Sequence, residues 1–362
     1  MSSTSPRAPM RAARLYGPGD IRIDEVPAPG DPGPLQAIVS PLWSGICGTD
    51  IKEYTGHGGS ADSKPHPLTG YAGLPITLGH EFSARVDAVG SGIQGVEVGD
   101  EVAVYPLLHC GKCAACLRGE YQICDIKAWN GLSSPWGGFG QQVLVEHYQL
   151  APLRGISTVA GAVIEPAAVA LNAVQHARVA PGDTVLVVGA GAIGMLCMLA
   201  AKALGAAAVH VFEPNPSRAA LIERLGGIAV PAAAAGDIPG YLADLTDGLG
   251  VDVAIDAAGK PASNEAAIAS VRAGGTVGVP SVHPGPITVD VRRLTRFDLT
   301  MVGTVGYTRK AWDETVELTR AGQLPLENIV TAKIGLDDIA AQGFDVLSTP
   351  SDQLKILIQV NE

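Results

Sequence analysis

A glycine-rich turn between a predicted strand and a predicted helix constrains the fold of this chain more than any other feature. The strand covers Thr184 to Val188, the helix covers Ala192 to Leu204, and the turn has the form G-x-G-x-x-G. Its three glycines are Gly189, Gly191 and Gly194. In this context they permit a tight turn, a close approach of the backbone to a pyrophosphate, and close packing of helix on strand. The turn predicts a dinucleotide-binding site, with packing alone as the alternative reason for the glycines.

An acidic residue bears on which dinucleotide is bound. Glu213 follows the next predicted strand, Val209 to Phe212, where a carboxylate can accept hydrogen bonds from both ribose hydroxyls of NAD. The same charge repels the 2′-phosphate of NADP, although Arg218 could offset that repulsion or stack against the adenine. We therefore expect NAD, with NADP as the alternative. The expected cofactor-binding residues are Gly189, Gly191, Ala192, Ile193, Gly194, Glu213 and Arg218.

Strands and helices alternate throughout residues 161–305, with Ala-rich helical segments between the strands. Alternation of this kind predicts a doubly wound parallel sheet, the Rossmann architecture, with helices on its faces. We expect this region to be the nucleotide-binding domain. Its further predicted strands are Val253 to Asp256, Gly275 to Val279 and Leu299 to Val302.

The first part of the chain, residues 10–160, has a different pattern, in which short β-rich runs are separated by glycine and proline. This pattern predicts an antiparallel, barrel-like domain. A helix, Lys310 to Ala321, and an apolar run, Leu354 to Val360, come after the nucleotide-binding region. They are too small to bury a core of their own, so we expect residues 306–362 to return to the first domain. The predicted strands of that domain are Ile21 to Val26, Ala37 to Pro41, Phe82 to Val89, Glu101 to Tyr105 and Gln142 to Val145.

The charge and the apolar runs exclude two classes of partner. The chain has 25 lysines and arginines against 36 aspartates and glutamates, a net charge of −11 without a basic stripe, which argues against nucleic acid. Apolar runs such as Met195 to Ala203 are far shorter than a bilayer-spanning helix, so we expect no membrane insertion. The segment Met1 to Pro9 lacks the apolar core of a signal peptide, which favours a cytoplasmic protein.

Four cysteines lie close together in the pattern C-x2-C-x2-C-x7-C: Cys110, Cys113, Cys116 and Cys124. In a large chain without a secretory signal, such spacing favours a metal over disulfides. Four thiolates make a closed, tetrahedral, structural zinc site. One alternative is reduced thiols crowded by chance. Another is a nucleic-acid-binding zinc finger, but the basic Lys112 and Arg118 are matched by the acidic Glu120 and Asp125.

A second group of possible ligands comprises Cys47, the pair His80-Glu81, and Glu165, which precedes the predicted helix Pro166 to Gln175. Together they supply sulfur, nitrogen and oxygen and leave zinc an open position for water or substrate. Taken singly, each residue has an ordinary alternative. A lone cysteine or histidine suits a core or a surface, and Glu165 suits the positive end of a helix dipole.

Along the chain, the motifs follow one another as Cys47 with Gly48-Thr49-Asp50, Gly79-His80-Glu81, the four cysteines, Gly138-Phe139, Glu165-Pro166 and the glycine-rich turn. In this order they resemble the zinc-dependent medium-chain dehydrogenase/reductase family, from about Met10 to Val360. The resemblance implies a GroES-like β-barrel catalytic domain, a Rossmann domain, NAD, two zinc ions per chain, and a homodimer or homotetramer. It also implies a catalytic zinc held by Cys47, His80 and Glu165, with Glu81 beside the metal and able to exchange onto it. There is one departure, because Lys52 stands where the family usually has a histidine that passes protons to solvent.

The resemblance implies that the substrate is a small-molecule alcohol or ketone. Three groups of residues carry a closer resemblance, within the family, to enzymes of a vicinal diol and its α-hydroxyketone, such as 2,3-butanediol and acetoin. They are residues 12–14 with 20–23, residues 64–69, and residues 306–307, 336–338 and 343–344. We expect Thr49 to accept the alcohol proton and to pass it toward Lys52 or His57, although Lys52 is equally interpretable as a solvated surface charge. The alternatives are a polyol or sugar dehydrogenase of the same family, and a binding protein that zinc and nucleotide merely stabilise.

Overall fold

The computed structural model describes residues 8–59, 64–283 and 285–362, so most of the N-terminal segment Met1 to Pro9 lies outside the described residues. The chain divides into two compact units. The first contains Met1–Glu165 and Val330–Glu362, and the second contains Pro166–Ile329. In the described part of the chain, no helix has the length and apolar character needed to cross a bilayer.

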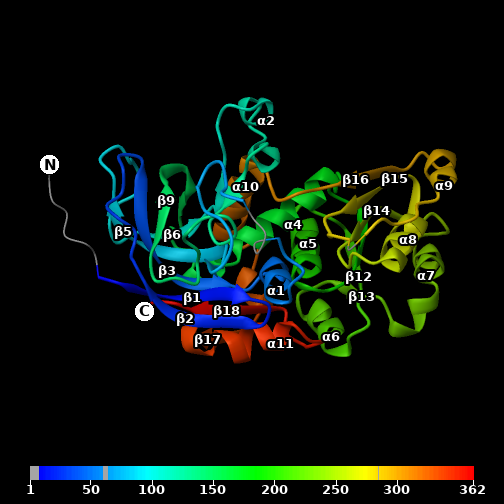
Figure 1. The fold of residues 1–362 in the computed structure, drawn as a ribbon. Helices are drawn as coiled ribbons and strands as arrows, with labels where there is room; N and C mark the ends of the chain where they lie inside the picture. Colours follow the sequence, from blue (N-terminus) through cyan, green and yellow to red (C-terminus); the bar gives the residue numbers. More distant parts are fainter. Residues whose placement is uncertain (1–7, 60–63, 284) are drawn as a thin grey trace. The chain divides into compact units, whose positions relative to one another are not determined.

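The first unit is built on antiparallel β-structure, as predicted. Its larger sheet has the order β10-β6-β5-β3-β18-β17, with β9 also paired to β3, and a smaller sheet has the order β2-β1-β4 (Figure 1). The central strand β3 is buried along nearly its whole length, with only Gln36 and Trp43 partly exposed. The strands are β1 (Met10–Gly17), β2 (Asp20–Val26), β3 (Gln36–Gly45), β4 (Ile76–Thr77), β5 (Glu81–Val89), β6 (Glu101–Val104), β7 (Leu107–Leu108), β8 (Ala128–Trp129), β9 (Val143–Glu146), β10 (Leu150–Pro152), β17 (Val330–Gly335) and β18 (Lys355–Gln359).

The late strand β18 belongs to the sheet of the first unit. It pairs antiparallel with the end of β3 and parallel with β17. Its apolar residues join a buried cluster with residues from much earlier in the chain, among them Leu15, Ile76 and Phe139. The first unit is therefore completed by residues that follow the second unit in sequence. Its helices are α1 (Gly48–Tyr54), α2 (Ala114–Leu117), α3 (Thr158–Gly161) and α11 (Asp345–Leu347).

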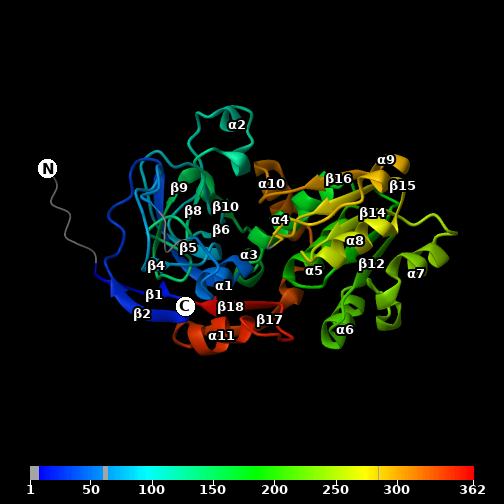
Figure 2. The ribbon, with the colours of Figure 1, turned by 45° about the vertical axis from the view of Figure 1, so that its right-hand side comes forward.

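The second unit is a doubly wound parallel sheet of order β13-β12-β11-β14-β15-β16, which confirms the predicted Rossmann architecture. Because crossovers between parallel strands are right-handed, α5 and α6 lie on one face and α7 and α8 on the other (Figures 1 and 2). The strand order reverses between β11 and β14. The strands are β11 (Thr184–Val188), β12 (Ala208–Phe212), β13 (Ile228–Ala229), β14 (Val251–Asp256), β15 (Val271–Val279) and β16 (Thr300–Gly303).

Helix α10 lies within the second unit, whereas the sequence placed the return to the first domain at residue 306. Hydrogen bonds join this segment to α4: Asn172 donates to the carbonyl of Gly306 (3.2 Å) and accepts from the N–H of Thr308 (3.5 Å), and Gln175 donates to Glu314 (2.6 Å). The helices are α4 (Ile164–His176), which begins in the first unit, α5 (Ala192–Ala203), α6 (Pro216–Arg224), α7 (Ile238–Leu245), α8 (Pro261–Ser270), α9 (Val291–Arg296) and α10 (Arg309–Arg320).

Candidate active site

Cys47 stands between the end of β3 and the start of α1. It is the N-cap of that helix and has an extended backbone. Its N–H donates a hydrogen bond to Oδ2 of Asp50 (2.9 Å). The Asp50 side chain thereby satisfies one of the N–H groups that have no partner within the helix at its start. The hydroxyl of Thr49 lies 3.8 Å from the Cys47 sulfur. The start of α1 thus places a thiol and a hydroxyl side by side.

His80 occupies the short connection between β4 and β5. The residue before it, Gly79, has φ +94°, and a Cβ atom there would lie 2.8 Å from the backbone nitrogen of Phe139. Glycine is therefore required where the chain bends to present the imidazole. His80 is buried, and its Nδ1 lies 3.4 Å from Oδ1 of the fully buried Asp50. Burial lowers the pKa of His80, but the negative charges of Asp50 and Cys47 outweigh burial and raise it well above its ordinary value.

Glu81 opens β5 opposite Gly45, the last residue of β3. A Cβ atom on Gly45 would collide with Oε2 of Glu81, so the glycine makes room for the carboxylate. Oε2 accepts a hydrogen bond from Nζ of Lys355 (2.5 Å), and this ammonium also donates to the carbonyl of Ile46 (3.1 Å). The pair is buried, with side-chain exposures of 3% for Lys355 and 1% for Glu81.

Donor atoms of Cys47, His80 and Glu81 lie within 4.8 Å of one another. Among the described residues, Oε1 of Glu81 is buried and lacks a hydrogen-bond partner, which leaves a carboxylate oxygen available to a cation. Asp50 faces Nδ1 of His80 and so leaves Nε2 for a metal, the usual arrangement around a metal-binding histidine. This set of sulfur, nitrogen and oxygen donors fits zinc.

Among the described residues, the group of donor atoms that lie within 4.8 Å of one another does not include Glu165. It is buried in the first turn of α4. Its charge helps to raise the pKa of Lys355, so it lies within electrostatic range of the same group. Lys52 and His57 are both exposed, Lys52 on α1 and His57 just after it. The His57 ring lies 3.1 Å from the Thr55 hydroxyl.

The four cysteines of the second predicted site also come together, with their sulfur atoms within 4.8 Å of one another. The separations between sulfurs are 3.9 Å for Cys110 and Cys116 and 3.6 Å for Cys110 and Cys124, too long for disulfide bonds. Backbone N–H groups point at the sulfurs: that of Cys113 donates to Cys110 (3.4 Å) and that of Cys116 to Cys113 (3.5 Å). Such donors favour thiolates, the form that binds zinc.

The thiols of this lobe are electrostatically unequal. Backbone N–H groups of Asp125 and Cys116 lower the pKa of Cys113 to about 6. Backbone donors also lower the pKa of Cys110, while burial raises the pKa of Cys116 to about 12. A bound zinc ion would deprotonate all four thiols. The four clustered sulfurs are therefore a candidate for a closed, structural zinc site.

The glycine-rich turn joins β11 to α5 in the second unit. Gly189 has φ +98°, and Gly191 is the N-cap of α5. A Cβ atom on Gly194 would lie 1.8 Å from the carbonyl oxygen of Gly189, so packing alone already requires the third glycine. Ala192 and Ile193 form the first turn of α5, whose N–H groups can bind a phosphate.

Glu213 follows β12 and closes over this turn. Its Oε2 accepts from the N–H of Ala190 (2.8 Å) and its Oε1 from the N–H of Asn215 (3.0 Å). Each oxygen keeps a second lone pair for another donor. Arg218 is partly buried on α6. The structure therefore places the acidic residue at the turn, as a site for ribose hydroxyls requires.

The sequence did not predict two residues that contact the Cys47, His80 and Glu81 group: Asp50, which faces His80, and Lys355, which pairs with Glu81. Asp50 carries a weak signal, because an acid three residues after an N-cap residue suits the first turn of a helix. Lys355 carries another, because it is a single lysine at the start of an apolar strand. Neither signal indicates which distant side chain is the partner.

Comparison with known proteins decides the family. The model of the alcohol dehydrogenase GroES-like domain matches residues 33–155, and the model of the zinc-binding dehydrogenase matches residues 192–321. This chain belongs to the zinc-binding alcohol dehydrogenase family. The resemblance to medium-chain dehydrogenases is thereby confirmed, and the protein is an enzyme of the oxidoreductase class that acts on alcohols.

Relatives of this zinc-binding alcohol dehydrogenase act on different alcohols. An (R,R)-butanediol dehydrogenase of Bacillus subtilis (strain 168) is 36% identical over 97% of this chain and 100% of its own. A sorbitol dehydrogenase of the same strain is 29% identical over 100% of both chains.

Solved structures show the same fold. The crystal structure of 2R,3R-butanediol dehydrogenase from Bacillus subtilis has a TM-score of 0.90 at 34% identity, over 97% of this chain and 100% of that chain. A Sinorhizobium meliloti 1021 protein, described as a zinc-binding dehydrogenase bound to NADP, has a TM-score of 0.86 at 29% identity, over 98% and 100% of the two chains.

Proposed function

We propose that this protein is an NAD-dependent dehydrogenase that interconverts a vicinal diol and an α-hydroxyketone, with 2,3-butanediol and acetoin as the expected pair. The observation that carries the proposal is the donor group of Cys47 with the buried His80 and Glu81, together with the Thr49 hydroxyl beside the thiol. Zinc, when bound, supplies a Lewis acid that lowers the pKa of an alcohol, and the nicotinamide ring supplies a hydride acceptor.

The chain's own residues have separate tasks in this proposal. Cys47 and His80 would hold the catalytic zinc, and Glu81 would lie beside it with its free oxygen available for exchange. Glu165 would be the third ligand, a role that the family resemblance implies and that its charge interaction with Lys355 supports. Asp50 keeps the His80 ring oriented from the opposite side. The Thr49 hydroxyl, 3.8 Å from the Cys47 sulfur, would accept the proton that the alcohol gives up and at the same time pass its own proton through the cofactor ribose toward Lys52 or His57.

A second zinc ion belongs to the lobe of Cys110, Cys113, Cys116 and Cys124, where four sulfurs leave no position for substrate. The proposed stoichiometry is therefore two zinc ions per chain. Metal analysis of the purified protein tests it. A value near one would remove one of the two assignments, and the Cys47→Ala and Cys113→Ser variants would show which.

The preference for NAD rests on Glu213. Its carboxylate bonds to the backbone beside Gly189, so a negative charge is fixed at the turn where the adenosine ribose of a dinucleotide would lie. That charge repels a 2′-phosphate. NADP is the alternative, supported by the Sinorhizobium structure and by the nearby Arg218.

The preference for a vicinal diol is supported by the butanediol dehydrogenase of Bacillus subtilis at 36% identity, and a polyol such as sorbitol is the alternative. The test is a panel of separated 2,3-butanediol stereoisomers, sorbitol, threonine and a simple secondary alcohol, each with NAD and with NADP. The proposal predicts the highest kcat/KM for one butanediol stereoisomer with NAD. A higher kcat/KM for sorbitol would assign the polyol reaction instead.

A further inference from the structure

Three turns meet at the carboxyl edge of the parallel sheet in the second unit. They follow β11, β14 and β15, which are neighbours in the sheet, and they border the point where the strand order reverses. Ligands of doubly wound sheets bind at this edge and at this reversal. The first turn is the glycine-rich turn described above. The second and third, residues 257–260 and 280–283, have no assigned role.

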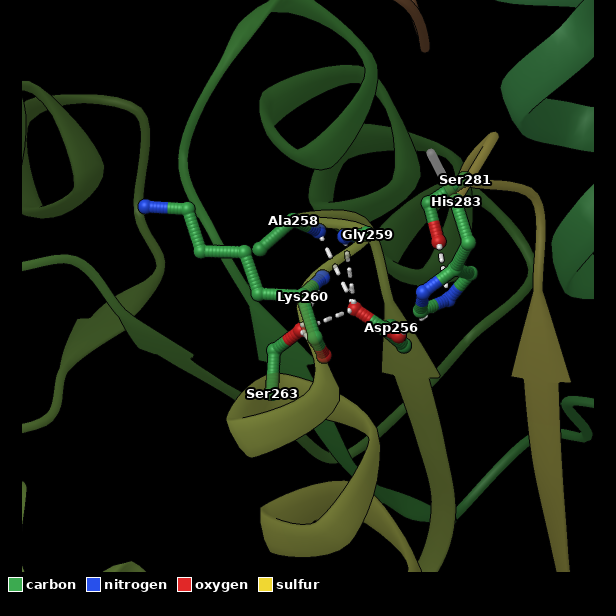
Figure 3. Close-up of polar contacts among 7 residues, drawn as sticks. All are labelled: Asp256, Ala258, Gly259, Lys260, Ser263, Ser281 and His283. Carbon is green, nitrogen blue, oxygen red and sulfur yellow. Dashed lines mark hydrogen bonds and ion pairs between the residues drawn. The ribbon is translucent and has the colours of Figure 1, made fainter. Parts of the chain in front are cut away.

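Asp256, the last residue of β14, connects the second and third turns (Figure 3). It is completely buried, and its Oδ1 accepts from the N–H groups of Ala258 and Gly259 (3.1 Å each) and from the Ser263 hydroxyl (2.7 Å). Its Oδ2 lies 3.1 Å from Nε2 of His283. Because a carboxylate only accepts, Nε2 carries the hydrogen and donates it.

The turn at residues 257–260, which Asp256 holds in place, packs against the glycine-rich turn. A Cβ atom on Gly189 would lie 2.9 Å from the Cβ of Ala258, so these two turns are in close contact. Gly259 has φ +66°, and a Cβ there would lie 3.2 Å from the Cβ of Ser281. The turn held by Asp256 is therefore packed between the turn of His283 and the turn of Gly189.

The Ser281, His283 and Asp256 group is not a nucleophile relay. A serine–histidine–aspartate relay places the hydroxyl and the carboxylate on opposite ring nitrogens. Here the Ser281 hydroxyl lies 3.5 Å from Nε2, the nitrogen that already faces Asp256. The His283 side chain is 12% exposed, and its Nδ1 is buried without a hydrogen-bond partner among the described residues. The contacts thus favour a role in holding the turns over a role in covalent chemistry.

We propose that His283 is a positioning residue for the bound dinucleotide: its hydrogen bond to Asp256 holds residues 280–283 against residues 257–260, which in turn hold Gly189. This inference rests on the proposed function, because it takes the glycine-rich turn to be the cofactor site. Loss of the bond loosens the turn that receives the pyrophosphate. Cofactor affinity then falls, while the metal groups, which lie in the first unit, keep their ligands.

The test measures NAD binding by isothermal titration calorimetry at 25 °C on zinc-loaded protein. His283→Ala is expected to raise the Kd for NAD about tenfold, because it removes a hydrogen bond to a buried charged group. His283→Gln is expected to bind within about threefold of the original protein, because its amide nitrogen can reach the place of Nε2 and donate to Asp256. The exposed His176, in the same unit, provides the control variant His176→Ala, which is expected to leave the Kd unchanged.

Steady-state kinetics separate positioning from general damage. His283→Ala is expected to raise KM for NAD while kcat at saturating NAD changes less than about threefold. Circular dichroism and zinc content establish that each variant is folded and loaded. If His283→Ala does not fold, His283→Asn replaces it, because its shorter amide does not extend to Asp256.

The inference is overturned if His283→Ala binds NAD as tightly as His176→Ala, or if His283→Gln binds as weakly as His283→Ala. A fall in kcat at unchanged KM would overturn it as well. Failure of the proposed function is a different result, since it is seen in the unaltered protein: no binding of NAD or NADP, or no oxidation of any alcohol in the panel.

Discussion

Replacing Lys355 by methionine is expected to destabilise the first unit by about 3 to 5 kcal/mol, the usual cost of leaving one member of a buried ion pair unpaired. Nζ of Lys355 lies 2.5 Å from Glu81 and 3.1 Å from the Ile46 carbonyl, and methionine supplies neither donor. Burial lowers the pKa of Lys355, but the charges of Glu81 and Cys47 outweigh burial and raise it. The residue is therefore charged at neutral pH, and its loss leaves the carboxylate unbalanced.

Tryptophan fluorescence during urea unfolding measures the effect, because Trp43, Trp129 and Trp136 belong to the first unit and Trp312 to the second. With a slope of about 2 kcal/mol per molar urea, the midpoint is expected to fall by roughly 1.5 to 2.5 M. The control is Lys333→Met, the same change at an exposed site on β17, where the ammonium lies 5.4 Å from the Trp43 ring centre. Its midpoint is expected to fall by less than about 0.5 M.

A double variant distinguishes charge imbalance from lost packing. Glu81→Gln combined with Lys355→Met removes both charges and is expected to recover at least about half of the lost stability, since the cost comes from the unpaired charge. Zinc content is measured in each protein so that stabilities are compared at equal loading. Equal midpoints for Lys355→Met and Lys333→Met would refute the reasoning.

Three further predictions concern the metal lobe, the cofactor and the proton path. Cys113→Ser is expected to remove about one zinc ion and lower thermal stability, whereas Cys47→Ala removes about one zinc ion and abolishes turnover in a folded protein; metal analysis with activity assays checks both. Glu213→Ala is expected to lower the ratio of kcat/KM for NAD to kcat/KM for NADP. A higher kcat/KM for NADP than for NAD in the unaltered protein would contradict the role of Glu213. Lys52→Ala is expected to slow diol oxidation most at low pH; an unchanged pH profile beside a collapsed one in His57→Ala would move the role to the histidine.

Local spacing made the glycine-rich turn and the cysteine lobe predictable. In both, every residue that matters lies within a short stretch, so the sequence itself specifies the geometry. Gly189 and Gly194 are close because a single turn separates them. They tolerate the close contact because glycine has no side chain. The predicted strand Thr184–Val188 was found with the same bounds for a related reason. Its buried part, Val185 to Val188, is a continuous apolar run, as is typical of a parallel strand covered on both faces.

Partnerships across long sequence separations could not be predicted in the same way. Lys355 and Glu81 are 274 positions apart, and their pairing depends on the register of β18 against β3 and of β3 against β5. His283 and Asp256 meet because β14 and β15 are neighbours in the sheet. Sheet order and register follow from the packing of the whole unit, which residue types alone do not reveal.

The late position of β18 sets an order of events during synthesis. The second unit is one continuous stretch, Pro166–Ile329, so its sheet can form as soon as that stretch has left the ribosome. The first unit begins earlier but needs β17 and β18, and Glu81 stays without its lysine until residue 355 has been made. Through most of translation the nascent chain therefore carries an open edge on β3 and an unbalanced acid, Glu81, beside Cys47 and His80. When β18 is added, it pairs with the edge of β3, and its Lys355 pairs with Glu81.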